Sequence, residues 1–377
     1  MKNRPILLFI PAIERGGVER NVVFWAKILR AEGFRVVLVF ARAEASQLQR
    51  FDAGVEHLHL KPKNQWRFVH KRLNDALGIG KQFSDYLRKI KAEKPVCISF
   101  QSSTISIPIC RWHGVPVIAR LSNHGANARH EQALLRKLAE AIKPMTHRLA
   151  SAIVANSGDL AEYYSAVFGC GVYTVFNPVD TNQLSHRSFQ GGRVGNNETQ
   201  VIFAAGRLEK QKDFATLLQA FQIVRADRSC RLKIAGSGSQ EASLRNLALE
   251  LGISDSVEFL GFQEDVVSYM KLSDLFVVSS LYEGFPNVLI EAIAAGSAVV
   301  STNCPTGPRE ILLDGRGGWL VDVGDPKALA QAMGQALSDP DERQKRWQVA
   351  LAGLERFAVS AVTKQITAVL EKVGMRK

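Results

Sequence analysis

The chain has 377 residues, which is long for one hydrophobic core and predicts two domains of about 150 to 200 residues each. Apolar residues make up 46% of the composition and aromatic residues 8%, which excludes an intrinsically disordered chain. The net charge of +12 lies entirely in residues 1–180, so this half is expected to meet an anionic partner, which would be nucleic acid, an anionic membrane surface or a polyphosphate substrate.

The five cysteines include no Cys-x-x-Cys pair, which argues against a disulfide framework or a zinc site and favours a reducing cytoplasm. The apolar run at residues 6–10 is too short for a signal peptide and predicts a first strand. No run approaches the 18 apolar residues of a membrane span. The sequence therefore predicts a protein that is neither secreted nor integral to a membrane.

The first elements predict a parallel, doubly wound α/β sheet. After the strand at 6–10 come a loop with Gly16 and Gly17, a helix at 20–31 and a strand at 35–40. A glycine pair lets a phosphate approach the backbone closely, although a tight turn before a helix is the simpler interpretation.

Residues 61–72 interleave aromatic side chains with cations. A helix is predicted at 81–94, and strands at 96–100 and 115–120. The cations of the basic segment are Lys61, Lys63, Arg67, Lys71 and Arg72.

His124 follows the strand at 115–120, at the carboxyl end where doubly wound sheets place their ligands. A loop histidine is more often a surface residue, but this position favours a functional role. The following helix, 128–142, carries Arg129, Arg136 and Lys137 around an apolar face. This pattern resembles an interfacial helix, and an amphipathic core helix with a solvated basic face is the alternative.

Strands at 152–155 and 173–176 close the first half, and residues 185–199 predict a linker or loop. The domain boundary is therefore placed near residue 180. The second half starts afresh with strands that are each followed by a loop and a helix; they are predicted at 201–205, 231–235, 257–260, 275–278 and 298–301. Residues 341–373 predict a helix with little breaking.

Two acids lie at the junction between the strand at 275–278 and a helix predicted over 288–295. Glu283 is in the loop, and Glu291 is about one turn into the helix. If the helix begins near Asn287, its first free amides carry the positive end of the helix dipole and can bind a diphosphate. Glu291 would then accept hydrogen bonds from a ribose diol. A turn with two solvated acids is the alternative.

Arg207 and Lys212 lie five residues apart in the loop after the strand at 201–205. The rim of the sheet that carries them also carries Glu283 and the helix start. Two cations opposite a helix amino terminus would neutralise a diphosphate leaving group. The alternative is two solvated cations.

With these residues assembled, the chain resembles a retaining glycosyltransferase of family four, which has the GT-B fold. The resemblance covers nearly the whole chain and is closer in the second half. It is carried by Gly16 to Arg20, Gly206-Arg207-Leu208 with Lys212, Gly236-Ser237-Gly238, Gly261-Phe262, and Glu283 with Glu291.

The resemblance implies two facing Rossmann-like domains with parallel sheets, an acceptor domain at 1–180 and a nucleotide-sugar domain at 181–355. A helix at 356–377 would pack back across the hinge. Arg207 and Lys212 would bind the diphosphate with the amides of Val288 and Leu289.

The resemblance also implies contacts with the rest of the donor. Glu291 would hold the ribose, Phe262 would lie near the base, and Gly17 would approach the phosphates. Gly236 would belong to the same donor site, and His124 matches a histidine near the reacting centre. The sugar would meet Glu283, Phe285, Pro286 and Asn287.

The sequence around Glu283 most resembles that of bacterial transferases that build surface or protein-linked glycans from UDP-N-acetylhexosamines. No Asp-x-Asp pair appears in the loops that carry Arg207, Lys212 and Glu283, so neither a metal nor another cofactor is expected. The acceptor would be a lipid-linked glycan at the inner face of the cytoplasmic membrane, with the basic residues of the first half near its phosphates. A non-catalytic nucleotide-sugar or lipid-glycan binder is the main alternative, and no nucleic-acid recognition motif is visible.

Overall fold

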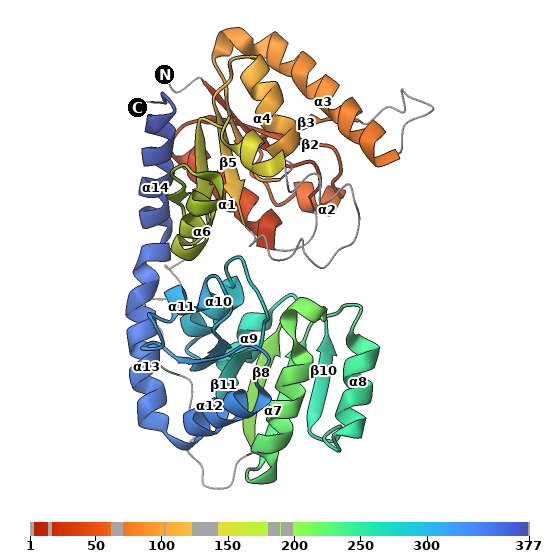
Figure 1. Ribbon diagram of the computed structural model, residues 1–377, viewed down its shortest axis with the longest axis vertical. Helices are drawn as coiled ribbons and strands as arrows, with labels where there is room; N and C mark the ends of the chain where they lie inside the picture. The colour runs from red at the N-terminus through yellow and green to blue at the C-terminus, as the bar shows by residue number, and fades with distance from the viewer. Residues whose placement is uncertain are drawn as a thin grey trace. The chain divides into compact units, whose positions relative to one another are not determined.

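The chain forms two compact units. Unit 1 consists of Met1–Pro178 and Val359–Lys377, and unit 2 of Val179–Ala358. Figure 1 shows a separate sheet with its own helices in each unit. The structure, a computed structural model, describes residues 4–13, 17–61, 71–101, 103–122, 142–179, 189 and 199–375.

The described strands of unit 1 pair in parallel in the order β3-β2-β1-β4-β5-β6-β7. Ile6 and Leu8 face one core cluster, whereas Leu7 and Phe9 face another. Both faces of the sheet are therefore buried, which is why its inner strands are continuous apolar runs. The strands are β1 (Pro5–Phe9), β2 (Arg35–Phe40), β3 (Glu56–His59), β4 (Val96–Ser99), β5 (Val117–Leu121), β6 (Ala152–Ala155) and β7 (Tyr173–Thr174).

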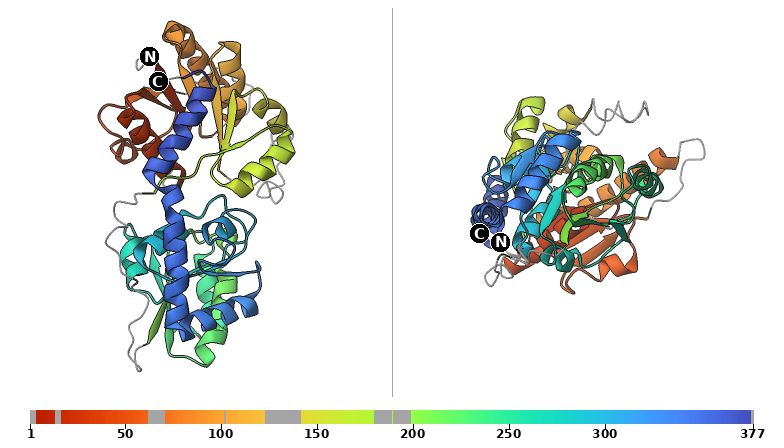
Figure 2. Two further views of the ribbon diagram at one scale, coloured as in Figure 1. Left: turned by 90° about the vertical axis from the view of Figure 1, so that its left-hand side faces the viewer. Right: turned by 90° about the horizontal axis from the view of Figure 1, so that it is seen from below.

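Helices cover both faces of this sheet. α1 and α14 pack on the face of Ile6, with Trp25 and Ile366 in its core, and α3, α4 and α6 pack on the face of Phe9. Figure 2 shows α14 along the sheet. The helices are α1 (Gly17–Ala31), α2 (Ala45–Leu48), α3 (Lys71–Ile90), α4 (Ser103–Trp112), α6 (Gly158–Phe168) and α14 (Val359–Lys372), with a 3-10 turn η1 at Lys91–Glu93.

The described strands of unit 2 are also parallel, in the order β10-β9-β8-β11-β12-β13. The order reverses between β8 and β11, and sheets of this order bind their ligands beyond the carboxyl ends of the strands at that point. The strands are β8 (Gln200–Ala205), β9 (Cys230–Ala235), β10 (Val257–Gly261), β11 (Leu275–Val278), β12 (Val299–Thr302) and β13 (Trp319–Val321).

Helices α7, α8 and α12 cover one face of this sheet. On the other face α9 stacks Tyr269 on Phe203, at 5.6 Å between ring centroids, and the Trp347 indole of α13 donates to the Ile293 carbonyl of α10 at 2.8 Å. The helices are α7 (Phe214–Ala226), α8 (Glu241–Glu250), α9 (Val266–Lys271), α10 (Asn287–Ala295), α11 (Pro308–Ile311), α12 (Pro326–Ser338) and α13 (Pro340–Gly353), with 3-10 turns η4 (Lys210–Lys212) and η5 (Leu354–Phe357).

The predicted α/β class with two doubly wound parallel sheets is confirmed. The prediction of one helix over residues 341–373 was wrong in one respect, because this segment forms two helices. The 3-10 turn η5 follows α13, and the chain is extended at Ala358, with φ −58° and ψ 147°. The break occurs because α13 packs in unit 2, whereas α14 begins where the chain returns to unit 1.

Candidate functional site

Four loops of unit 2 leave the sheet at its carboxyl edge. They follow β8, β9, β11 and β12 and comprise residues 206–213, 236–239, 279–286 and 303–307. Because the strands are parallel, these loops gather at one edge, and those after β8 and β11 flank the reversal in strand order. The sequence analysis placed Lys212 and Glu283 in these two loops.

The structure brings Lys212 and Glu283 into direct contact. The Lys212 Nζ lies 2.5 Å from the Glu283 Oε1, and the two side chains are only 17% and 8% exposed. The Ser280 hydroxyl also donates to Glu283 Oε1, at 2.7 Å. An ammonium group has three N–H donors, so Lys212 can be held by Glu283 and still donate to an anion.

Hydrogen bonds between the two loops fix the backbone behind this ion pair. The Ser279 hydroxyl donates to the Lys212 carbonyl at 2.8 Å, and the Leu281 amide donates to the Gln211 carbonyl at 2.9 Å. The Gln211 side chain donates in turn to the Tyr282 carbonyl at 2.8 Å. The position of the ammonium group is therefore set by backbone as well as by Glu283.

The loop after β12 supports the Glu283 loop from its other side. The Thr302 hydroxyl donates to the Ser280 carbonyl at 2.6 Å, and the Thr306 hydroxyl donates to the Glu283 carbonyl. Cys304 lies between these two threonines and is buried. Burial, assisted by the nearby Glu283 carboxylate, raises the pKa of the Cys304 thiol to about 12, so the thiol stays neutral.

The glycines after β9 allow two loops to pack backbone against backbone. A Cβ atom on Gly236 would lie 1.8 Å from the Gly206 carbonyl oxygen, and Gly236 has a φ of +146°. A Cβ on Gly238 would lie 2.4 Å from the Leu208 carbonyl oxygen. Packing alone therefore requires glycine at Gly236, and its contact with a donor stays a prediction.

Glu209 accepts hydrogen bonds from the amide and the hydroxyl of Ser239, at 3.0 and 2.8 Å, and these bonds are the main reason why the pKa of its carboxyl is lowered. The nearby Arg207, which is exposed, lowers this pKa to a smaller extent. Glu209 thus connects the loops after β8 and β9. Arg207 and Lys212 belong to the same loop, but only Lys212 forms an ion pair with Glu283.

The start of α10 differs from the prediction. The Leu289 amide, which was expected to bind phosphate, donates to the Pro286 carbonyl at 2.9 Å, and the Asn287 amide donates to the Phe285 carbonyl at 3.0 Å. Both amides close the turn that leads into the helix. The Val288 amide makes no hydrogen bond with another described residue, so the predicted set of amides narrows to Val288.

The aromatic residues predicted at the site have different environments. Phe262 follows β10 and is 62% exposed, so its ring is available for stacking. Phe285 is buried and packs edge-on against Phe357, with 5.3 Å between the ring centroids. Glu291 lies on α10 and is half-buried.

Several predicted residues lie outside the described part of the chain, namely His124, Lys63, Arg67, Arg129, Arg136 and Lys137. The predicted linker at 185–199 is described only at Phe189 and Thr199. In unit 1, Gly17 begins α1, Lys71 and Arg72 begin α3, and Lys61 is exposed. Within the described ranges, no helix has the length and apolarity needed to cross a membrane.

Sequence reasoning missed the supporting residues Ser280, Thr302, Thr306, Cys304 and Glu209. One signal could have found these positions, because all five residues lie at the carboxyl ends of β8, β11 and β12 or in the loops that follow. Their supporting roles could not be found in this way, because they depend on side-chain contacts.

Two family profiles match the chain. "Glycosyltransferase Family 4" matches residues 15–183, and "Glycosyl transferases group 1" matches residues 190–350. The chain is 35% identical over 148 residues to the lipopolysaccharide core biosynthesis glycosyltransferase LpsE of Rhizobium meliloti, a match that covers 39% of this chain and 42% of the relative.

A second relative is the N-acetylgalactosamine-N,N'-diacetylbacillosaminyl-diphospho-undecaprenol 4-alpha-N-acetylgalactosaminyltransferase of Campylobacter jejuni. It is 31% identical over 170 residues, covering 45% of each chain. The chain thus spans less than half the length of each of these relatives.

Solved structures match over almost the whole length. Anabaena Alr3699/HepE in complex with UDP-glucose has a TM-score of 0.78 at 20% identity and covers 97% of this chain and 99% of its own. The sucrose-phosphate synthase of Thermosynechococcus elongatus has a TM-score of 0.79 at 17% identity and covers 98% of this chain and 99% of its own. At these identities, the two solved structures show likeness of fold alone, and that fold is GT-B. The two profiles together cover most of the chain and show that it belongs to glycosyltransferase family four.

Proposed function

We propose that this chain is a retaining, metal-independent glycosyltransferase that moves a hexose or N-acetylhexosamine from a UDP-sugar to a lipid-linked glycan. The observation that carries the proposal is the Lys212 ammonium, held by Glu283 at the reversal point of the unit 2 sheet. The family supports transfer of a sugar, and the Anabaena neighbour, solved in complex with UDP-glucose, supports a UDP-sugar donor. The Campylobacter relative, named for transfer to a diphospho-undecaprenol-linked sugar, supports a lipid-linked acceptor.

In this proposal the diphosphate leaves from a site built on the loops after β8 and β11. As the bond between the anomeric carbon and the phosphate oxygen breaks, negative charge grows on the diphosphate. Lys212, Arg207 and the Val288 amide stabilise that charge. The acceptor hydroxyl forms its bond on the same face of the sugar, and its proton passes to the departing diphosphate, so no protein nucleophile is needed.

The other parts of the donor, its ribose, base and sugar, are each assigned a contact residue in this proposal. Glu291 holds the ribose through its carboxylate, and the exposed Phe262 ring stacks on the base. Glu283 faces the sugar beyond the phosphates while its Oε1 keeps Lys212 in place. His124 acts near the reacting centre from the first half of the chain.

The acceptor is proposed to lie at the inner face of the cytoplasmic membrane, where the protein is peripheral. Residues 1–180 hold 26 Lys and Arg against 14 Asp and Glu, and this excess favours an anionic lipid surface. Vesicle flotation with and without anionic lipid tests this part. Flotation only with anionic lipid is expected, and no flotation in either case would contradict it.

Release of UDP from a panel of UDP-sugars, with a diphospho-undecaprenol-linked sugar as acceptor, tests the activity. Lys212→Ala is expected to lower kcat, whereas Lys210→Ala, in the same 3-10 turn but exposed, is the matched control. Glu291→Ala is expected to raise the KM for the donor, with the exposed Glu250→Ala as its control. Donor binding without turnover on any acceptor would favour a non-catalytic binder, and normal kinetics in both variants would show that the site is misassigned.

A further inference from the structure

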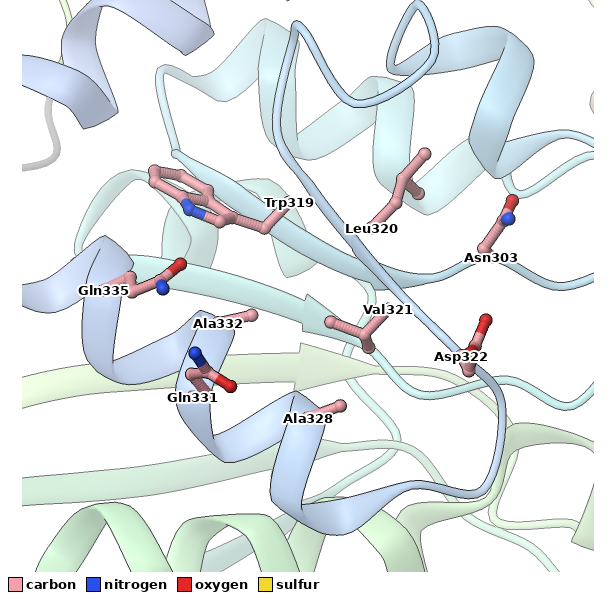
Figure 3. A pocket seen from close by; sticks show the side chains of 9 residues that line it. All are labelled: Asn303, Trp319, Leu320, Val321, Asp322, Ala328, Gln331, Ala332 and Gln335. Atoms are coloured by element: carbon pink, nitrogen blue, oxygen red, sulfur yellow. The ribbon is translucent and has the colours of Figure 1, made fainter.

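A second concave site lies at the outer edge of the unit 2 sheet. Edge strand β13 and helix α12 line an open cavity of about 340 Å³, which Figure 3 shows with its lining side chains. This volume is at the lower end of the range typical of small-molecule sites. No step of the proposed transfer uses its lining, which consists of Asn303, Trp319, Leu320, Val321, Asp322, Ala328, Gln331, Ala332 and Gln335.

Polar side chains surround this cavity. Asn303 and Asp322 follow β12 and β13, and Gln331 and Gln335 lie one turn apart on the same face of α12. All four residues are exposed, and none of their side chains forms a hydrogen bond or ion pair with another described residue. Their amide and carboxylate groups are therefore available to a ligand.

Trp319 also lines the cavity. Its indole is largely buried, and the Arg346 guanidinium lies 4.6 Å from the ring centroid, so little of the ring surface is exposed to the cavity. Figure 3 shows the indole nitrogen on the side of the ring nearest Gln335. This N–H makes no hydrogen bond with another described residue, so it is a further donor for a ligand. Ala328 and Ala332 have small side chains, which keep the space between helix and strand open.

The charge of the lining selects the class of ligand. Its nine residues include one carboxylate, Asp322, and no lysine or arginine, so a phosphate in contact with the lining would be repelled by Asp322. A hydroxyl group can both donate and accept a hydrogen bond, as amide side chains do, and a carboxylate accepts from two neighbouring hydroxyls. Three amides and one carboxylate beside the Trp319 indole therefore match a neutral sugar ring.

We propose that this cavity is a second sugar-binding site, separate from the donor site, which holds one neutral ring of a glycan. An extended peptide paired with the open edge of β13 is the other occupant that the position would permit. The lining favours the sugar, because four of its nine residues carry amide or carboxylate groups that can bond to hydroxyls, whereas a peptide strand is held mainly by its main chain and by apolar pockets.

The full-length chain, labelled with 5-fluorotryptophan, gives a direct test by ¹⁹F NMR. The Trp319 signal is assigned with the Trp319→Phe variant. Maltotriose, cellotriose and N,N′-diacetylchitobiose are then titrated with UDP present in excess, so that binding in the donor site does not contribute. At about 10 mM, a sugar nearly fills a site whose Kd is ~1 mM. We expect at least one of these probes to shift the Trp319 signal.

The double variant Gln331→Ala/Gln335→Ala is expected to weaken that binding by roughly tenfold. Its matched control is Gln344→Ala/Gln348→Ala, two exposed glutamines with the same spacing on α13 and outside the cavity lining. Both variants should bind UDP as the unmodified chain does, which separates this test from that of the donor site. The proposal is overturned if no probe shifts the Trp319 signal or if the two double variants bind the probe equally.

Discussion

Removal of one charge from the Lys212 and Glu283 pair should destabilise unit 2 strongly. The side chains are 17% and 8% exposed, so neither charge is well solvated when its partner is removed. Lys212→Met leaves the Glu283 carboxylate with the Ser280 hydroxyl as its remaining side-chain donor. Loss of one member of a buried ion pair lowers the free energy of unfolding by about 3 kcal/mol. This corresponds to roughly a 100-fold rise in the population of molecules in which unit 2 is unfolded.

The double variant Lys212→Met/Glu283→Gln should be less destabilised than the sum of the two single variants, because no buried charge is left alone. We expect a coupling energy of about 2 kcal/mol or more. The control is the ion pair between Glu241 and Arg245 on α8, which is 2.9 Å long with side chains 35% and 51% exposed. Exposed pairs one helical turn apart contribute only about 0.5 kcal/mol.

Hydrogen exchange measured by mass spectrometry is the suitable assay, since a chain with two units does not unfold in one step. Peptides from β8 and β11 report the opening of unit 2, and peptides from β1 report unit 1 as an internal control. The reasoning is refuted if the coupling at Lys212 and Glu283 is no larger than that at Glu241 and Arg245, or if the single variants expose unit 1 equally.

Three further results are expected. Gly236→Ala should lower the melting temperature of unit 2 by several degrees, because its Cβ would overlap the Gly206 carbonyl oxygen. Gly334 lies inside α12 with open space around it, so Gly334→Ala should stabilise unit 2 by about 1 kcal/mol in the same thermal melt. Burial lowers the pKa of His147 to about 4, so the unfolded chain binds a proton that the folded chain does not between pH 6.5 and 4. Unit 1 should thus lose about 3 kcal/mol over this range in urea titrations, and His147→Gln should remove that loss. Ellman's reagent at pH 8 should label Cys170 rapidly and buried Cys304 only on unfolding.

Inner strands were the most predictable part of the fold. Residues 152–155 and 275–278 form strands with the predicted bounds, since strands covered on both faces are uninterrupted apolar runs. Two edge strands, β3 at Glu56–His59 and β13 at Trp319–Val321, were not predicted. The four residues of β3 include one apolar side chain, and most of them are exposed. β3 therefore lacks the apolar run that identifies a buried strand.

The shared position of Lys212 and Glu283 at one edge of the sheet could be predicted, but their contact could not. Strand order and loop position brought Lys212 and Glu283 to one edge, and the sequence analysis gave them separate roles, on the diphosphate and on the sugar. Their contact joins residues 71 positions apart through side-chain conformations that no local pattern encodes. The pair matters for both roles, because the carboxylate that would face the sugar also orients the cation that would face the phosphates.

The start of α10 shows how a local turn changes the way charge is stabilised at such a site. A helix amino terminus offers unsatisfied amides only where the preceding turn has not already used them. Here the Asn287 and Leu289 amides donate to carbonyls of residues 285 and 286, whereas the Val288 amide makes no hydrogen bond with another described residue. In the proposed site, the negative charge of a bound diphosphate would then be balanced chiefly by Lys212 and Arg207. Because side-chain cations are screened by salt more than oriented buried amides are, we expect donor affinity to fall as ionic strength rises, and to fall less steeply in the Arg207→Gln variant.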